Sequence, residues 1–282
     1  MKLSGIRVRD PFFIKENDIF YLIGTTGNDC WEAGSDFSVY ATQDFENFEF
    51  VSTAFDKSNM PYHTQFWAPE IHKYKGKYYM LVSAKRQDRG TYILVSDKIN
   101  KGYKLLMDRP ITPPEWTCLD ATLYVENGEP YLVFSNEWVN TVNKDGDGSL
   151  FVAKLSDDLT EIISPCKKII SGKDSGFAKL VKYTDEIWGY IAEGPYLDKD
   201  DNGDLLLYWS TITDSGYCVA VSRSKNGIMG DFVFDKMLFD KDGGHCMVFE
   251  RNGKKYITFH QPNHSPHERA VIYDLDVLNS NK

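Results

Sequence analysis

Five ionisable residues recur along the chain at intervals of 50 to 73 residues, each inside a segment of similar pattern. They are Asp10, Glu70, Asp120, Glu193 and His245. Four are carboxylic acids, the groups that most often act as a paired general acid and general base. A carboxyl group that stays protonated beside one that stays ionised can cleave a glycosidic bond. The first protonates the leaving oxygen and the second activates water.

The segments around these residues read as strands joined by tight turns. A turn pair follows each ionisable residue, and the pairs Asn127-Gly128 and Asn252-Gly253 are strong hairpin signals. Aromatic-rich strands return after the turns, and a second hairpin follows in most copies, as in residues 217–221 and 232–234. Helical periodicity is nearly absent. Four strands per repeat at this period are typical of a propeller blade.

Five copies without a linker-like stretch predict one architecture for the chain. We expect an all-β fold, a five-bladed β-propeller with four-stranded antiparallel blades around a central channel, formed by residues 1–282 as a single catalytic domain. A pair of β-sandwiches is the alternative, but it would not repeat one motif five times.

The first strand of every blade lines the channel of a propeller, so the five ionisable residues should face one axial pocket. Carboxylates that share a partly buried cavity repel one another, so at least one pKa should be raised while its neighbours stay ionised. For any single carboxylate, a structural role such as pairing with Arg9 or Arg269 is an equal alternative. For all four together, that alternative is poor because burying unpaired like charges is costly.

Tryptophans accompany three of the carboxylates. Trp67, Trp116 and Trp188 precede Glu70, Asp120 and Glu193 by three, four and five residues. We expect their rings in loops at the pocket mouth, where the C–H faces of a sugar can stack on them. Packing between blades is the alternative. Trp209 lies inside a predicted strand and is expected in the core.

Composition excludes several classes of partner. The net charge of −9 argues against nucleic acid, whose phosphates need a basic face. No run of 18 apolar residues exists, which predicts no membrane-spanning helix and no membrane partner. Five scattered cysteines without a CxxC spacing predict reduced thiols. Because the opening residues show no apolar signal core, we expect a cytoplasmic location, with a removed secretion signal as the alternative.

At its motifs the sequence resembles glycoside hydrolase family 43, five-bladed propeller hydrolases that act on glycans containing arabinose, xylose or galactofuranose. The matching motifs are Arg9-Asp10-Pro11, Trp67-Ala68-Pro69-Glu70, Leu119-Asp120-Ala121-Thr122-Leu123, Glu193-Gly194-Pro195 and Gly244-His245-Cys246-Met247-Val248-Phe249. They span nearly the whole chain in the family's order.

The resemblance implies a role for each catalytic candidate. Asp10 would be the general base, Glu193 the general acid, and Asp120 the residue that tunes the pKa of the acid and orients it. The family inverts the anomeric centre, which requires a gap of roughly 6.5–9.5 Å between base and acid. No organic cofactor is implied. His245 is a candidate contact for a calcium ion near the channel centre, with a hydrogen-bonded pocket residue as the alternative.

The resemblance also suggests how substrate is bound. Residues expected to contact an oligosaccharide are Trp67, Glu70, Trp116, Trp138, His245 and Arg269. Ala121 and Asn136 depart from residues common in the family, and Asn136 leaves the choice of sugar open. The ending from His260 to Arg269 is similar to the arabinofuranosidase-like branch.

The expected reaction is therefore inverting hydrolysis of α-L-arabinofuranosyl linkages in oligosaccharides derived from arabinan or arabinoxylan. The alternatives are a β-xylosidase, an endo-arabinanase or a galactofuranosidase of the same family. A carbohydrate-binding propeller without catalysis is a further alternative, disfavoured because all three catalytic carboxylates are present.

Overall fold

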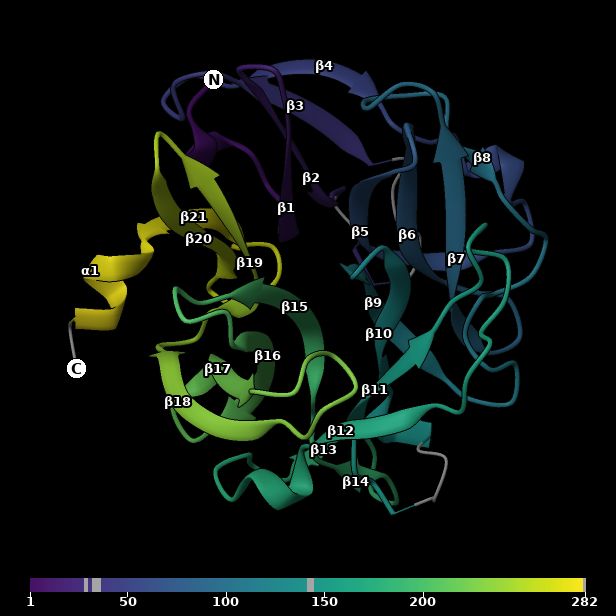
Figure 1. Ribbon diagram of the computed structural model, residues 1–282, viewed down its shortest axis with the longest axis vertical. Coiled ribbons are helices and arrows are strands. Elements are labelled where there is room, and N and C mark those ends of the chain that lie inside the picture. Colours follow the sequence, from purple (N-terminus) through teal and green to yellow (C-terminus); the bar gives the residue numbers. More distant parts are fainter. Residues whose placement is uncertain (28–29, 32–36, 141–144, 281–282) are drawn as a thin grey trace.

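The chain folds into five antiparallel β-sheets placed around a central axis, so the predicted five-bladed β-propeller is confirmed (Figure 1). This is a computed structural model, and it describes residues 1–282 except 28–29, 32–36, 141–144 and 281–282. In the described part, the strands of these five sheets follow one another in sequence order from the axis outwards, and a sixth, two-stranded sheet lies apart from them.

The first three blades each contain four strands. Blade 1 has β1 (Arg9–Glu16), β2 (Ile19–Thr25), β3 (Ser38–Thr42) and β4 (Glu49–Thr53). Blade 2 has β5 (Thr64–Tyr74), β6 (Lys77–Lys85), β7 (Arg89–Ser96) and β8 (Lys104–Leu105). Blade 3 has β9 (Cys118–Glu126), β10 (Glu129–Asn136), β11 (Ser149–Lys154) and β12 (Lys167–Ser171).

The last two blades follow a small hairpin of β13 (Val181–Lys182) and β14 (Trp188–Gly189). Blade 4 has β15 (Glu193–Lys199), β16 (Leu205–Thr213), β17 (Gly216–Ser224) and β18 (Val233–Asp240). Blade 5 has β19 (Gly244–Arg251), β20 (Lys254–Gln261) and β21 (Arg269–Asp274), and α1 (Leu275–Ser280) follows it. Four short 3₁₀ turns complete the described elements: η1 (Leu3–Gly5), η2 (Lys57–Asn59), η3 (Trp138–Asn140) and η4 (Lys173–Ser175).

The outer edge of blade 5 is covered by the beginning of the chain. Arg7 forms an isolated antiparallel bridge with Arg269 of β21, in the position that a fourth strand holds in the other blades. Ile6 and Val8 beside it are buried. The first and last blades are therefore joined by segments from opposite ends of the sequence, which Figure 1 shows as purple beside yellow.

The hairpin turns adopt the geometry that their residues favour. Asn127 and Gly128 have φ values of 53° and 83°, and Asn252 and Gly253 have 52° and 73°. A two-residue turn of this kind needs φ above zero at both positions, which Asn and Gly tolerate best. These turns fix the pairing of the two innermost strands in blades 3 and 5.

Every inner strand is interrupted by a bulge at the same height. The register between the first two strands shifts in all five blades, and one residue of each bulge lies in the left-handed region with φ between 47° and 57°. These residues are Asp10, Ala68, Asp120, Gly194 and His245. In each blade, the residue that precedes the bulge residue pairs with a residue of the second strand. In blade order these partners are Thr25, Ser83, Ser135, Ser210 and His260. A bulge re-aims the side chains beside it, often next to an active site.

Buried polar side chains tie each bulge to the preceding blade. The bulge N–H of Ala68 donates to Thr25 Oγ1 at 2.7 Å, that of Asp120 to Ser83 Oγ at 2.9 Å, and that of His245 to Ser210 Oγ at 2.8 Å. At the junction of blades 5 and 1, the N–H of Asp10 donates to His260 Nδ1 at 3.2 Å. These bonds hold non-glycine residues in a left-handed conformation that would otherwise be unfavourable.

The hydrophobic core lies between and within the blades. Trp209 is 1% exposed and packs in the core of blades 3 and 4, as predicted. All five cysteines are free thiols. Among the described residues, no helix is long and apolar enough to cross a membrane.

Candidate active site

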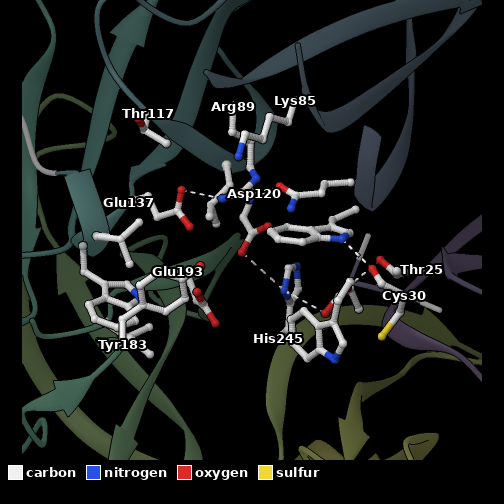
Figure 2. Close-up of a pocket in the computed structure, with 18 of the residues that line it drawn as sticks. Thr25, Cys30, Lys85, Arg89, Thr117, Asp120, Glu137, Tyr183, Glu193 and His245 are labelled. Atoms are coloured by element: carbon white, nitrogen blue, oxygen red, sulfur yellow. Dashed lines mark hydrogen bonds and ion pairs between the residues drawn. The ribbon is translucent and has the colours of Figure 1, made fainter. Parts of the chain in front are cut away.

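A cavity of about 650 Å³ opens around the propeller axis, and the bulges supply its floor. Asp10, Asp120 and His245 occupy equivalent bulge positions, and Glu193 stands one residue before the bulge residue of blade 4. All four line the cavity, so residues up to 235 positions apart in sequence meet there. Figure 2 shows Asp120, Glu193 and His245 around this space. The volume suits a small ligand such as one or two sugar rings.

Three neighbours fix Asp10, two through its carboxylate and one through its backbone. Thr25 Oγ1 donates to its Oδ2 at 2.7 Å, and His245 Nδ1 lies 3.1 Å from its Oδ1. The backbone N–H of Asp10 is fixed by His260. Burial alone would raise the pKa of Asp10, but the charge and hydrogen bond of His245 outweigh it and hold that pKa well below its usual range. Asp10 is therefore ionised at every pH at which the protein is expected to work.

His245 lies between two carboxylates. Its Nδ1 is 3.1 Å from Asp10 Oδ1 and 3.6 Å from Asp120 Oδ2. Burial would lower the pKa of the imidazole, but the two carboxylates raise it to about 10. His245 is thus an imidazolium at neutral pH, and it offsets the negative charge that the cavity concentrates.

The pKa values of Asp120 and Glu193 are raised, whereas that of Asp10 is lowered. Asp120 Oδ2 accepts a hydrogen bond from the N–H of Gly194 at 3.2 Å, so it is tied to the residue after Glu193. Burial is the largest cause that raises the pKa of both groups, and the nearby carboxylates add to it. Two such groups share their protons and titrate together. The cavity therefore holds one permanent carboxylate and a pair that retains a proton at neutral pH.

One wall of the cavity is built from alternating aromatic rings and guanidinium groups. The Arg89 guanidinium lies 4.0 Å from the Trp67 ring centroid, and Arg9 lies 4.6 Å from that of Trp31. The two indoles meet edge to face at 5.9 Å. Arg89 is also paired with Glu137. Stacked cations and ion pairs keep these rings rigid, which is what a sugar face requires of its platform.

Three residues expected to contact substrate lie outside the residues that line the cavity, which corrects their predicted placement. Glu70 follows the bulge residue Ala68 by two positions and points to His72, with Nε2 and Oε2 2.8 Å apart. Its repeat position was misjudged because the bulge, which the sequence pattern does not show, changes which side chains face the axis.

Trp116 and Arg269 are also placed elsewhere. The Trp116 ring is partly buried and packs on Phe151 at 4.8 Å, against the core shared by blades 2 and 3. The Arg269 guanidinium donates to the carbonyl oxygens of Ser4 and Glu268, where the start of the chain covers blade 5. Trp188, expected at the mouth, is half-exposed under Lys182 and is not part of the lining.

Trp67 and Trp138 do line the cavity. Trp138 meets Tyr183 edge to face at 6.1 Å, so the η3 turn and the loop after β13 form one rim. Several lining residues were not anticipated: Thr25, Trp31, Gln65, Arg89, Glu137, Tyr183 and Asn263. Thr25 faces inward because it pairs with Arg9, next to the bulge in β1. No sequence motif marks the other six residues.

The residues around His245 do not fit a calcium ion held by its imidazole. A protonated imidazole has no free lone pair at the charged nitrogen and repels a cation, and calcium prefers several oxygen ligands. In the described part of the chain, no three His, Cys, Asp or Glu side chains form a group that could hold a metal ion.

Comparison with known proteins places this site in a family. Residues 4–275 match Glycosyl hydrolases family 43. The chain belongs to that family. It is a glycosidase of a family that implies an oligosaccharide substrate, and four of the motifs that suggested the resemblance supply Asp10, Asp120, Glu193 and His245 to the cavity.

Individual relatives agree with this assignment. The solved endo-arabinase from Bacteroides thetaiotaomicron VPI-5482 is 29% identical, with a TM-score of 0.86 over 97% of this chain and 96% of that one. The extracellular exo-α-(1→5)-L-arabinofuranosidase ArbA of Cellvibrio japonicus is 23% identical over 89% of this chain and 73% of its own length. An extracellular exo-α-(1→5)-L-arabinofuranosidase of Streptomyces avermitilis is 27% identical, but the match covers only 31% of it.

These relatives overturn one expectation. Three curated relatives are named extracellular enzymes, so the predicted cytoplasmic location is wrong. The prediction rested on scattered cysteines and on the first residues of the sequence. Neither observation indicates whether a protein without disulfides is secreted.

Proposed function

We propose that the protein hydrolyses α-L-arabinofuranosyl linkages in arabinan- or arabinoxylan-derived oligosaccharides with inversion at the anomeric carbon, without an organic cofactor. The observation that carries the proposal is the contrast between Asp10 and Glu193, two carboxyl groups in one cavity whose pKa values are displaced in opposite directions. That contrast is what separates a general base from a general acid.

The proposed reaction uses the two groups in one step. Asp10, ionised and oriented by Thr25 and His245, accepts a proton from a water molecule as it attacks the anomeric carbon. Glu193 donates its proton to the departing glycosidic oxygen. His245 offsets the negative charge that Asp10 carries before it takes the proton, and Asp120 fixes the backbone beside Glu193.

The choice of arabinose is supported by the named activities of the relatives. An endo-arabinase and several arabinofuranosidases are among them, and the endo-arabinase matches nearly the whole of both chains. Because both exo-acting and endo-acting enzymes are among the relatives, the position of the cleaved bond along the chain has to be measured. The β-xylosidase and galactofuranosidase activities are outcomes of the same experiment.

The test compares 4-nitrophenyl α-L-arabinofuranoside, the matching β-xyloside and β-galactofuranoside, and linear arabino-oligosaccharides. We expect turnover of the arabinosides, with proton NMR showing the inverted anomer first. Asp10→Asn should lose activity on every substrate, by on the order of 10³-fold or more, and Glu193→Gln should lose it mainly on oligosaccharides, because nitrophenol leaves without protonation.

Glu70→Gln is the matched control, because Glu70 is a buried carboxylate outside the cavity lining. It should retain the wild-type rates. Turnover of only the xyloside or galactofuranoside would overturn the proposed sugar. Retained oligosaccharide activity in Asp10→Asn or Glu193→Gln would overturn the assigned roles.

A further inference from the structure

Tyr217 reaches the candidate acid from a strand far from the axis. It lies at the start of β17, the third strand of blade 4, and its side chain is 1% exposed. Its hydroxyl donates a hydrogen bond to Glu193 Oε1 at 2.9 Å. No motif in the sequence marks this residue, and it is not among the residues that line the cavity.

A glycine in blade 5 makes room for the ring. The residues just before the bulge residue in blades 1 to 4 carry side chains that line the cavity, namely Arg9, Trp67, Leu119 and Glu193. In blade 5 this position is Gly244. A Cβ there would lie 2.5 Å and 2.6 Å from two carbons of the Tyr217 ring. The ring of Tyr217 therefore fills the space that a fifth side chain would take.

The ring is fixed on its face as well. It stacks on His260 with centroids 5.5 Å apart and planes 27° from parallel. The carbonyl of Tyr217 accepts from Gly243 N–H at 2.8 Å, which joins the start of β17 to the residue before Gly244. Packing thus leaves the hydroxyl directed at Glu193.

The charged groups around Tyr217 determine which partner donates. Glu193, Asp120 and Asp10 act on it as carboxyl groups, Arg9 faces it as a cation, and His260 lies against its ring. Burial and the carboxylates raise the pKa of the phenol well above its usual value, so it keeps its proton. The hydroxyl is therefore a donor to Glu193.

We infer that Tyr217 is a positioning residue for Glu193: its hydrogen bond occupies Oε1 and leaves Oε2 as the oxygen that carries the proton to the leaving group. This inference rests on the proposed role of Glu193 as general acid. The proton moves from Glu193 Oε2 to the glycosidic oxygen as the bond to the anomeric carbon breaks, and Tyr217 keeps its own proton throughout.

The experiment is Tyr217→Phe, which retains the ring and removes the hydroxyl. We expect the rate on arabino-oligosaccharides to fall on the order of 10- to 100-fold, because proton transfer from a misoriented acid is inefficient. The rate on 4-nitrophenyl arabinofuranoside should change less than about threefold, since that leaving group needs little protonation. The alkaline limb of kcat/KM should move to higher pH, because the lost hydrogen bond had stabilised ionised Glu193.

Tyr196→Phe is the matched control. Tyr196 belongs to blade 4, is partly buried, and donates a hydrogen bond of 2.8 Å to the carbonyl of Val248 instead of to Glu193. It should leave the ratio of the two rates and the alkaline limb unchanged. Equal losses on both substrates with an unmoved limb in Tyr217→Phe would overturn the inference, because a merely structural role predicts that result.

The double variant separates this inference from the function on which it rests. With Glu193→Gln present, Tyr217→Phe should have no further effect on the oligosaccharide rate. If Glu193→Gln keeps the oligosaccharide rate, the proposed acid is wrong. If Glu193→Gln is inactive and Tyr217→Phe behaves as wild type, only the role of Tyr217 is wrong. Gly244→Ala, which crowds the ring, should reproduce the Tyr217→Phe ratio of rates.

Discussion

The carboxylate of Asp120 accepts a hydrogen bond from the backbone N–H of Gly194, the residue that follows Glu193. At three other junctions between blades, a Ser or Thr hydroxyl of the preceding blade accepts the equivalent N–H. Here the hydroxyl of Ser135 donates to the carbonyl of Ala192 instead. A carboxylate has thus replaced the usual hydroxyl, and it joins the candidate pKa-tuning residue to the candidate acid through one peptide unit.

Asp120→Asn should separate the charge of this residue from its hydrogen bond, since Asn Oδ1 can still accept from Gly194. A neighbouring negative charge raises the pKa of a carboxyl group, so its removal should lower the pKa of Glu193. The alkaline limb of kcat/KM should therefore move to lower pH, with a loss on the order of tenfold at pH 7. An alkaline limb that stays in place or moves upward would contradict the coupling.

The pH profile of the unmodified enzyme should be one-sided. The base must be ionised, and the pKa of Asp10 lies below its usual value, so activity should not decline from neutral pH down to about pH 4. The acid must be protonated, and its proton is lost as pH rises through the raised pKa of the Asp120–Glu193 pair. Initial rates at fixed ionic strength would check this. An acidic limb above pH 5 in the folded enzyme would exclude Asp10 as the base in this environment.

The five blades could be predicted because their signals are local. Turn pairs such as Asn127-Gly128 and Asn252-Gly253 determine the hairpins through two adjacent residues. Asp10, Asp120 and His245 were placed together because repeat positions become neighbours in a closed ring. Trp209 was assigned to the core because it lies inside a predicted strand, and it is 1% exposed.

The inward direction of individual side chains could not be predicted in the same way. A bulge changes the face to which the next residues point, and no residue type marks it here, since Asp, Ala, Gly and His all occupy its left-handed position. Glu70 was therefore assigned to the cavity although it faces His72. Tyr217 was missed because its contact with Glu193 depends on the absence of a side chain at Gly244.

Trp67→Ala and Trp116→Ala should have opposite consequences. Trp67 lines the cavity and stacks on Arg89, so its loss should raise KM on the order of tenfold or more. Trp116 packs on Phe151, so its loss should leave KM unchanged and lower the free energy of unfolding by roughly 2 kcal/mol, less than for a fully buried Trp. Kinetics and urea unfolding of both variants provide the comparison. A KM effect in Trp116→Ala alone would reverse the assignment.

Chelation should leave activity intact. The His245 imidazole is engaged by Asp10 and carries a positive charge at neutral pH, which disfavours a cation beside it. Dialysis against EDTA should therefore change neither kcat nor the melting temperature, as measured against an undialysed sample. Recovery of lost activity by added calcium, but not by sodium at equal ionic strength, would show that an ion belongs to the site.

We expect the effect of His260 on kcat to depend on Nδ1 of its imidazole and not on Nε2. Nδ1 accepts the N–H of Asp10 at 3.2 Å, and Nε2 lies 3.1 Å from Asn263 Oδ1. Burial and the charge of Arg9 lower the pKa of this histidine to about 3, so at neutral pH the Nδ1 acceptor is free of a proton. The tautomer that suits both contacts therefore donates from Nε2 to Asn263 and accepts at Nδ1.

His260→Asn places an amide oxygen near the position of Nδ1, whereas His260→Gln places a polar group near the position of Nε2. If the bond to Asp10 holds the base in its left-handed conformation, His260→Asn should retain kcat within about threefold. His260→Gln should lose on the order of tenfold or more in kcat on both oligosaccharide and nitrophenyl substrates, because the base acts on both. Melting temperatures of the two variants serve as the control for packing. Equal kcat values for the two variants at equal stability would mean that the hydrogen bond between Asp10 and His260 contributes only to the fold.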